Sequence, residues 1–263
     1  MRNWIMGMAL AALPLVAAAQ DTSLKSLDTS DSGRAWMAVG RLDIDGTGFC
    51  TGALISPTLV LTAAHCLFEK GTSKRIDPAR IEFLAGWRRG RASAYRAARQ
   101  AVIHPKYQYD DGVATERVQY DLALIELWQP VRNTTVIPFE TGDRPVRGQE
   151  VSVVSYAHDR AEAPSLQQVC SVMARQSGFL VVSCDVDFGA SGAPIFSFTE
   201  ERPRIVSVVS AKAELNGQSV ALGTALEESL QLLQAELASG RGFGLSSTNT
   251  TSGENVGARF VKP

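Results

Sequence analysis

Cysteine, histidine and long apolar runs are scarce in this sequence, and each scarcity excludes a class of protein. The chain has four cysteines and three histidines in 263 residues. It contains no Cys-x-x-Cys or His-Glu-x-x-His pattern, which argues against a metal centre. No apolar run after residue 19 is long enough to cross a bilayer. The formal net charge of −1 gives no overall attraction to nucleic acid or to anionic membranes.

The N-terminus has a pattern typical of export. Arg2 precedes an apolar run over residues 4–19, which ends in a small-residue cleavage site, Ala17-Ala18-Ala19. A short membrane anchor is the alternative, because the run approaches the lower limit for a spanning helix. Pro14 and the alanine ending favour a signal peptide over residues 1–19. We therefore expect a secreted or periplasmic protein that leaves the membrane after cleavage.

The overall composition is that of a soluble protein with disulfides. Apolar residues make up 45% of the chain and charged residues 20%, and the length allows a sizeable core. An even number of cysteines in an exported chain predicts two disulfides, for which three pairings exist.

Short β-type runs separated by turn residues dominate the chain from residue 35 onward. A first series covers 35–42, 49–56, 58–62, 81–86, 97–103 and 122–127, and a second covers 151–156, 168–174, 180–184, 193–198, 205–210 and 220–223. Residues 129–147, between the two series, have the proline and glycine content of a linker. Many short strands with little helix favour barrels or sandwiches.

One helix is expected near the end of the chain. Leu226, Leu230, Leu233 and Leu237 recur at helical spacing, and Gly240 provides a stop. The expected units are a signal peptide (1–19), a flexible or removable leader (20–34), an N-terminal β-barrel (35–130), a connector (131–147), a C-terminal β-barrel (148–225), the helix (226–240) and a disordered tail (241–263).

Three short motifs bring together the residue types of nucleophilic catalysis. His65 lies in TAAHC, Asp121 opens DLALI, and Ser191 lies in GASGAP. A serine hydroxyl needs a base such as histidine to remove its proton, and a buried aspartate fixes the histidine tautomer. Glycines beside the serine allow the amides of Gly189 and Ser191 to point together at a developing oxyanion. Each motif alone is more often structural, and only their combination points to catalysis.

TAAHC, DLAL and GASGAP, in this order, resemble the chymotrypsin/trypsin-like serine protease family. Ser210 lies 19 residues after Ser191, as does the family serine that supports the acid and lines the substrate channel. The resemblance covers residues 35–240. It implies an all-β fold of two six-stranded antiparallel β-barrels with a C-terminal helix. It also implies peptide-bond hydrolysis by His65, Asp121 and Ser191 through an acyl-enzyme, with no cofactor and no metal.

The resemblance also implies a pairing of the cysteines. Cys50 lies 16 residues before Cys66, like the family disulfide that frames the catalytic histidine, which leaves Cys170 to pair with Cys184. Closing the second loop would contribute about 3 kcal/mol by chain-entropy reasoning. A free reactive thiol at position 170 or 184 is the alternative.

The chain departs from animal members of the family beside the nucleophile. The aspartate that usually pairs there with a freed N-terminus is Ala190, and no Ile-Val-Gly-Gly start follows Arg34. We therefore expect activity that does not depend on that ion pair. In this respect the chain looks like the bacterial glutamyl-endopeptidase-like members.

The candidate substrate-binding residues are Asp185, Ser210 and Lys212. Asp185 lies six residues before Ser191, the offset at which trypsin-like members select arginine or lysine. Asp187 replaces a family cysteine, so the pocket wall is built differently. Lys212 falls on the opposite wall, where it would neutralise Asp185 or favour an acidic substrate residue. Basic, acidic and other preferences therefore stay open, and both charges being solvated loop residues is the further alternative.

Two functions from different classes fit the sequence. One is an active serine endopeptidase on protein or peptide substrates, and the other is an inactive homologue that serves as a binding module. Esterase-only chemistry would use the same residues. We expect a monomer that binds no nucleic acid, with a protein inhibitor as a further candidate partner. His104, before Pro105, is predicted to lie in a surface turn.

Overall fold

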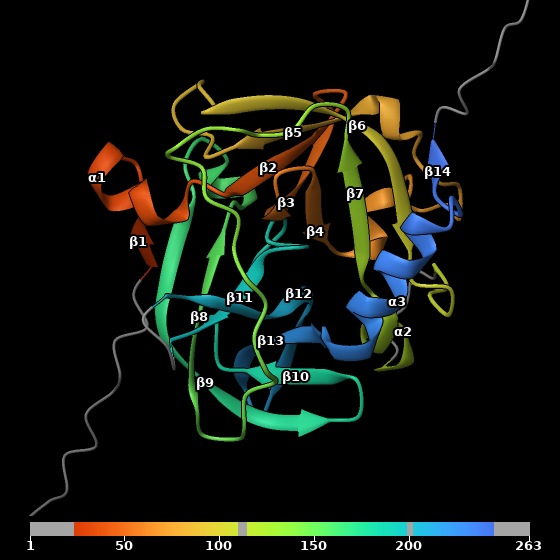
Figure 1. The fold of residues 1–263 in the computed structure, drawn as a ribbon. Helices are drawn as coiled ribbons and strands as arrows, with labels where there is room; N and C mark the ends of the chain where they lie inside the picture. Colours follow the sequence, from red (N-terminus) through yellow and green to blue (C-terminus); the bar gives the residue numbers. More distant parts are fainter. Residues whose placement is uncertain (1–23, 110–114, 199–201, 245–263) are drawn as a thin grey trace, which may run out of the picture.

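The computed structural model describes residues 24–109, 115–198 and 202–244. The predicted signal peptide lies outside these residues, as do 20–23 of the expected leader and 245–263 of the expected tail. Two closed antiparallel barrels of six strands each make up most of the fold, one above the other in Figure 1. The predicted all-β double barrel is therefore confirmed.

The N-terminal barrel closes in the order β6-β5-β2-β3-β4-β7, with β7 pairing back to β6. Its interior is filled by alternating side chains of strands such as β5, whose buried Ile81 and Phe83 flank an exposed Glu82. The six strands are β2 (Val39–Ile44), β3 (Gly48–Ser56), β4 (Leu59–Thr62), β5 (Ile81–Ala85), β6 (Ala94–Ile103) and β7 (Ala123–Leu127).

The C-terminal barrel closes in the order β9-β10-β13-β12-β11-β8, with β8 pairing back to β9. The six strands are β8 (Glu150–Ser155), β9 (Ser165–Gln176), β10 (Phe179–Val182), β11 (Pro194–Ser197), β12 (Arg204–Leu215) and β13 (Gln218–Ala225). All twelve barrel strands fall on runs that the sequence predicted.

Each end of the described chain adds a strand to the barrel formed by the other half. β1 (Leu24–Ser26) pairs with β9 of the C-terminal barrel, and β14 (Phe243–Gly244) pairs with β6 of the N-terminal barrel. These two pairings extend each closed barrel to a seven-stranded sheet.

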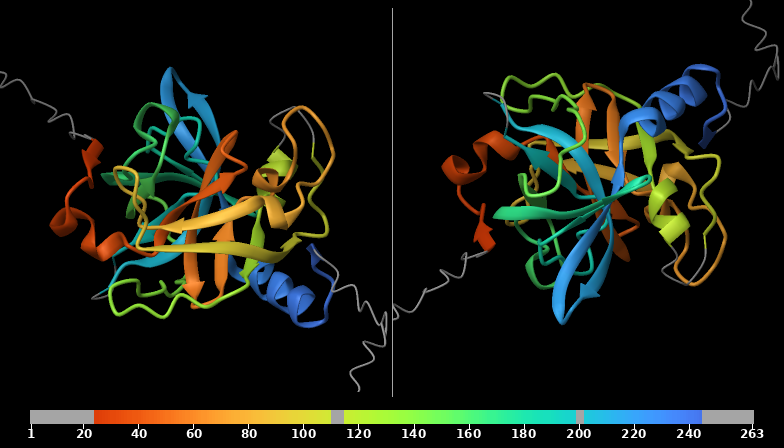
Figure 2. Two further views of the ribbon diagram at one scale, coloured as in Figure 1. Left: turned by 90° about the horizontal axis from the view of Figure 1, so that it is seen from above. Right: turned by 90° about the horizontal axis from the view of Figure 1, so that it is seen from below.

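The predicted helix is confirmed as α3 (Glu227–Ala238), which packs against β6 and β7. Leu226, Leu230 and Leu233 are buried, so the leucine spacing does mark the face toward the barrel. Figure 2 shows α3, in blue, along the side of the N-terminal barrel. Two short helices were not predicted, α1 (Ser30–Gly33) and α2 (Thr115–Tyr120). Among the described residues, the helices are too short or too polar to span a membrane.

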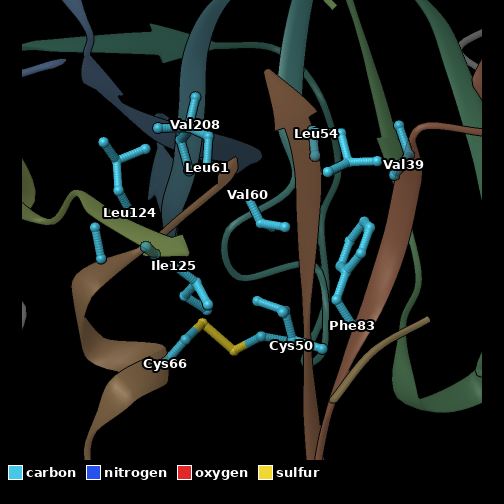
Figure 3. Packing of buried hydrophobic residues seen from close by; sticks show 14 of the residues in the cluster. Val39, Cys50, Leu54, Val60, Leu61, Cys66, Phe83, Leu124, Ile125 and Val208 are labelled. Carbon is cyan, nitrogen blue, oxygen red and sulfur yellow. A yellow bond between two sulfur atoms is a disulfide. The ribbon is translucent and has the colours of Figure 1, made fainter. Parts of the chain in front are cut away.

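The main hydrophobic core fills the N-terminal barrel and continues into the contact with the C-terminal barrel, where it includes Phe196 and Val208. The Cys50–Cys66 disulfide lies in this core, close to Val60 and Ile125 in Figure 3. The second disulfide, Cys170–Cys184, is fully buried in a separate core of the C-terminal barrel. No cysteine among the described residues is free.

The structure corrects three boundaries. Residues 35–38 were predicted to begin a strand, but Arg34–Trp36 is a 3₁₀ turn (η1) that buries Trp36 against Phe196. Residues 20–34 were expected to be a flexible or removable leader; within them, β1 and α1 are formed, and the start of α1 is fixed by a capping box between Thr29 and Ser32. Order at the other end extends through β14, past the expected limit at residue 240.

Candidate active site

The strand register of the N-terminal barrel brings His65 and Asp121 together. β4 pairs with β7 so that Thr62 lies opposite Ala123. His65 follows β4 on a 3₁₀ turn, η2 (Ala64–Leu67), and Asp121 precedes β7 by two residues. The neighbouring Cys66 anchors this turn to β3 through its bond to Cys50. The two motifs therefore meet at one edge of the barrel.

Asp121 is 1% exposed and accepts three hydrogen bonds. Its Oδ2 lies 2.6 Å from His65 Nδ1 and accepts from the Ser210 hydroxyl at 2.5 Å. Its Oδ1 accepts from the backbone N–H of His65 at 2.8 Å. A buried carboxylate is stabilised by such donors, and here they fix both the ring and the backbone of the histidine. The imidazole is held with Nε2 as its free nitrogen.

Ser191 lies on the loop between β10 and β11 of the C-terminal barrel. Gly189 and Gly192 on either side have φ values of +95° and +78°, which favour glycine. Ser191, Gly189 and His65 all line one cavity of about 1010 Å³. Within the described part of the chain, no hydrogen bond joins the Ser191 and His65 side chains. The loop thus places the serine on a cavity wall shared with the histidine.

The backbone N–H groups of Gly189 and Ser191 are available to a ligand. The Phe188 carbonyl accepts from the N–H of His158 at 2.7 Å. Because a trans peptide is planar, this contact turns the N–H of Gly189 to the opposite side. Neither that N–H nor the N–H of Ser191 donates to a group in residues 24–109, 115–198 or 202–244. The loop can therefore offer two donors to an anionic oxygen.

The candidate substrate-binding residues occupy different places. Ser210 and Lys212 line the cavity, whereas Asp185 lies outside its lining. Lys212 Nζ is 3.1 Å from Asp185 Oδ1, with about half of each side chain exposed. The predicted neutralisation of Asp185 by Lys212 is therefore present in the structure.

The part of the chain that the structure describes has one cluster of potential metal ligands, Cys50, His65 and Cys66. Both sulfur atoms are joined in the disulfide, so neither is available as a thiolate. This cluster is not suited to hold a metal ion.

His104 was predicted in a surface turn; the turn is confirmed by the bond from Tyr107 N–H to its carbonyl, but the surface position is wrong. His104 is 5% exposed, stacks on Tyr120 with ring centroids 4.8 Å apart, and accepts from the Lys106 N–H. Burial and the nearby Lys106 ammonium lower the pKa of His104. The buried ring thus packs on Tyr120, the last residue of α2 and the chain neighbour of Asp121.

Sequence reasoning missed three residues around the cavity. Thr51 on β3 and the backbone of His158 both bond to the nucleophile loop, from 138 and 30 residues away. Phe188 is 81% exposed at the cavity wall, an unusual position for a large apolar side chain. Of these three residues, only Phe188 has a signal in the sequence, which is its position just before Gly189.

Comparison with known proteins gives a family and a fold. The model of the trypsin-like peptidase domain matches residues 46–203, more than half of the chain. A solved structure described as Glu endopeptidase in complex with MPD superposes with a TM-score of 0.67 at 17% identity, covering 84% of this chain and 98% of that one. At this identity the superposition supports the fold alone.

Two curated relatives illustrate the sequence similarity. Glutamyl endopeptidase of Bacillus licheniformis is 24% identical over 171 residues, which cover 65% of this chain and 52% of that protein. Coagulation factor XII of Rattus norvegicus is 39% identical over 82 residues, 31% of this chain and 13% of that protein. The chain thus spans about half or less of these relatives. The family match and the double barrel together show that the chain belongs to the trypsin-like peptidase domain family, with a chymotrypsin-like fold.

Proposed function

We propose that this protein is a serine endopeptidase, with Ser191 as nucleophile, His65 as general base and acid, and Asp121 orienting the histidine. The observation that carries the proposal is the anchored His65–Asp121–Ser210 network facing the same cavity as Ser191. The protease relatives support the reaction class. The two disulfides are typical of an oxidising compartment, and we propose a secreted or periplasmic location.

The proposed reaction uses these groups in two halves. Ser191 Oγ attacks the scissile carbonyl carbon while His65 Nε2 takes its proton, and the N–H groups of Gly189 and Ser191 stabilise the oxyanion. The C–N bond then breaks, and the imidazolium gives the proton to the leaving amine. A water molecule attacks the resulting ester and passes a proton through His65 to Ser191, which releases the acid.

A fluorophosphonate probe tests the proposal directly. We expect covalent labelling of the folded protein, because the probe reacts with serines that a neighbouring base activates. Labelling should vanish in Ser191→Ala and persist in Ser239→Ala, which removes a hydroxyl at the end of α3. A folded wild type that takes up no label would instead support the binding module.

We further propose that acidic or neutral substrate residues are preferred over basic ones. Lys212 lines the cavity, and the Asp185 carboxylate with which it pairs lies outside the lining. The ammonium is therefore the charge of this pair that a substrate in the cavity would contact. A cation on the wall disfavours a cationic substrate side chain. The name of the Bacillus licheniformis relative, glutamyl endopeptidase, is in keeping with this preference.

Replacing Lys212 with methionine should reduce cleavage after acidic residues by about 3- to 10-fold, because an ion pair at a half-exposed site contributes about 1 kcal/mol. A peptide library that varies the residue before the cut measures the ratio of cleavage after acidic residues to cleavage after the other residues. Lys25→Met, at an exposed lysine of β1 outside the cavity lining, is the control. An unchanged ratio in Lys212→Met, or cleavage mainly after arginine and lysine in the wild type, would contradict the preference.

A further inference from the structure

Thr51 of β3 is the point at which the N-terminal barrel holds the nucleophile loop. Its side chain is fully buried. The hydroxyl donates to the Gly189 carbonyl at 2.8 Å and accepts from the N–H of Tyr156 at 3.1 Å. Its backbone N–H donates to the Ser191 carbonyl at 2.9 Å. One residue therefore bonds to both residues whose amides would stabilise the oxyanion.

These contacts fix the direction of the Gly189 amide from both sides. The peptide before Gly189, which carries its N–H, is held by the bond from His158 N–H to the Phe188 carbonyl. The peptide after it is held by the bond from the Thr51 hydroxyl and by the bond from Ala190 N–H to the Asp187 carbonyl. The segment that carries His158 is itself tied to the Thr51 hydroxyl through Tyr156. A glycine rotates more readily than any other residue, so an amide at this position needs such external contacts.

The residue just before Ser191 has no charge that could orient the Gly189 amide. Ala190 is fully buried and apolar, so the loop has no carboxylate at that position. The loop backbone instead packs closely between the two halves of the chain. A Cβ at Gly189 would approach the Phe49 ring of β3 to 2.5 Å and the backbone of Ala157, which follows β8, to 3.1 Å. The hydroxyl at position 51 satisfies the buried N–H of Tyr156 and the half-buried carbonyl of Gly189. A buried N–H that is left without a partner costs free energy.

We propose that Thr51 is a positioning residue, whose hydroxyl holds the Gly189 peptide in the orientation that stabilises the oxyanion. This inference rests on the proposed endopeptidase function. Thr51→Val keeps the shape of the side chain and removes both hydroxyl bonds. The Gly189 carbonyl and the segment that carries His158, which together orient the Gly189 N–H, then lose their side-chain anchor on β3. The loss should appear in the transition state, where the oxyanion forms, and not in substrate binding.

The test compares Thr51→Val with Thr51→Ser, which keeps the hydroxyl, and with Ser207→Ala. Ser207 is an equally buried residue of β12 whose hydroxyl donates to the Thr224 carbonyl, also at 2.8 Å. We expect kcat to fall about 10- to 100-fold in Thr51→Val with KM within about 3-fold of wild type. The affinity for a peptidyl aldehyde, which places an oxyanion in the site, should fall by the same factor. Thr51→Ser should restore kcat to within about 3-fold, and Ser207→Ala should leave it unchanged.

The proposal is overturned if folded Thr51→Val keeps kcat within about 3-fold of wild type, or if Ser207→Ala loses as much kcat, since the effect would then reflect stability alone. Thr51→Ala, judged by the same criteria, replaces Thr51→Val if the latter does not fold. A wild type inert to both the probe and peptides refutes the endopeptidase function. In that event the ¹⁵N–¹H signal of Gly189 decides on Thr51: a shift in Thr51→Val but not in Ser207→Ala supports the assignment, and an unchanged signal overturns it.

Discussion

Replacing Asp121 with asparagine is expected to lower kcat by about four orders of magnitude, the size of the tautomer effect in Ser-His-Asp hydrolases. The carboxylate accepts from His65 Nδ1, and this leaves Nε2 free to take the serine proton. An asparagine amide can donate to Nδ1 instead, which places the ring proton on Nε2 and removes the base. Steady-state kinetics on a cleaved peptide measure the loss.

The effect is expected to be large because the hydrogen bonds of Asp121 fix the orientation of its side chain. The backbone N–H of His65 donates to Oδ1, so the amide oxygen of an asparagine takes that place and its NH₂ group faces the ring. The Ser210 hydroxyl, which donates to Oδ2, can turn to accept from that NH₂ group. Asp31→Asn, at a carboxylate that is 96% exposed, is the matched control and should have wild-type kcat. A kcat within tenfold of wild type in folded Asp121→Asn would contradict the proposed role.

Gly192→Ala is expected to destabilise the protein by about 3–5 kcal/mol, a large part of the usual stability of a domain. A Cβ at this position would approach Thr62 Oγ1 to 2.1 Å, the Thr51 carbonyl to 2.3 Å and the Ala63 nitrogen to 3.0 Å. Two of these atoms belong to the backbone, which cannot move without shifting β3 or the turn before His65. Urea unfolding with linear extrapolation measures the change.

Gly217→Ala separates the steric effect from the backbone strain. Gly217 has a φ of +79°, almost equal to that of Gly192, but nothing lies within 4 Å of a Cβ there. The strain of a left-handed residue alone should cost about 1–2 kcal/mol. Equal losses in the two variants would show that the nucleophile loop does not rest on the barrel as tightly as the distances indicate.

The barrels could be predicted because their strands have local signals. Runs such as Leu59–Thr62 and Ala123–Leu127 are apolar, β-prone and bounded by turn residues, so each is recognisable on its own. β1 and β14 have no such local signal. Both are very short and exposed or half-exposed, and they exist only because a distant strand offers an open edge.

The site shows the same division between local and distant information. His65, Asp121, Ser191 and the cavity-lining Ser210 could be named from motifs and their order. Thr51 could not, because its bond to Gly189 joins residues 138 positions apart and its neighbours mark only an ordinary strand. The burial of His104 was missed for a related reason: its position before a proline marks a turn, but the Tyr120 ring that covers it comes from α2. Tertiary contacts overrode the local pattern in both cases.

The crossed chain ends give the two barrels more than a single covalent link. The half that builds the N-terminal barrel keeps β1 on the opposite barrel, while the other half lays α3 and β14 on β6 and β7. After a cut within 131–147, each piece would therefore still be paired with a strand of the other piece. His65 and Ser191 belong to different barrels. A rotation of one barrel that separated them would therefore also have to break the contacts of β1, α3 and β14 with the opposite barrel. The exchanged chain ends thus add to the shared core as contacts that hold His65 and Ser191 on one cavity.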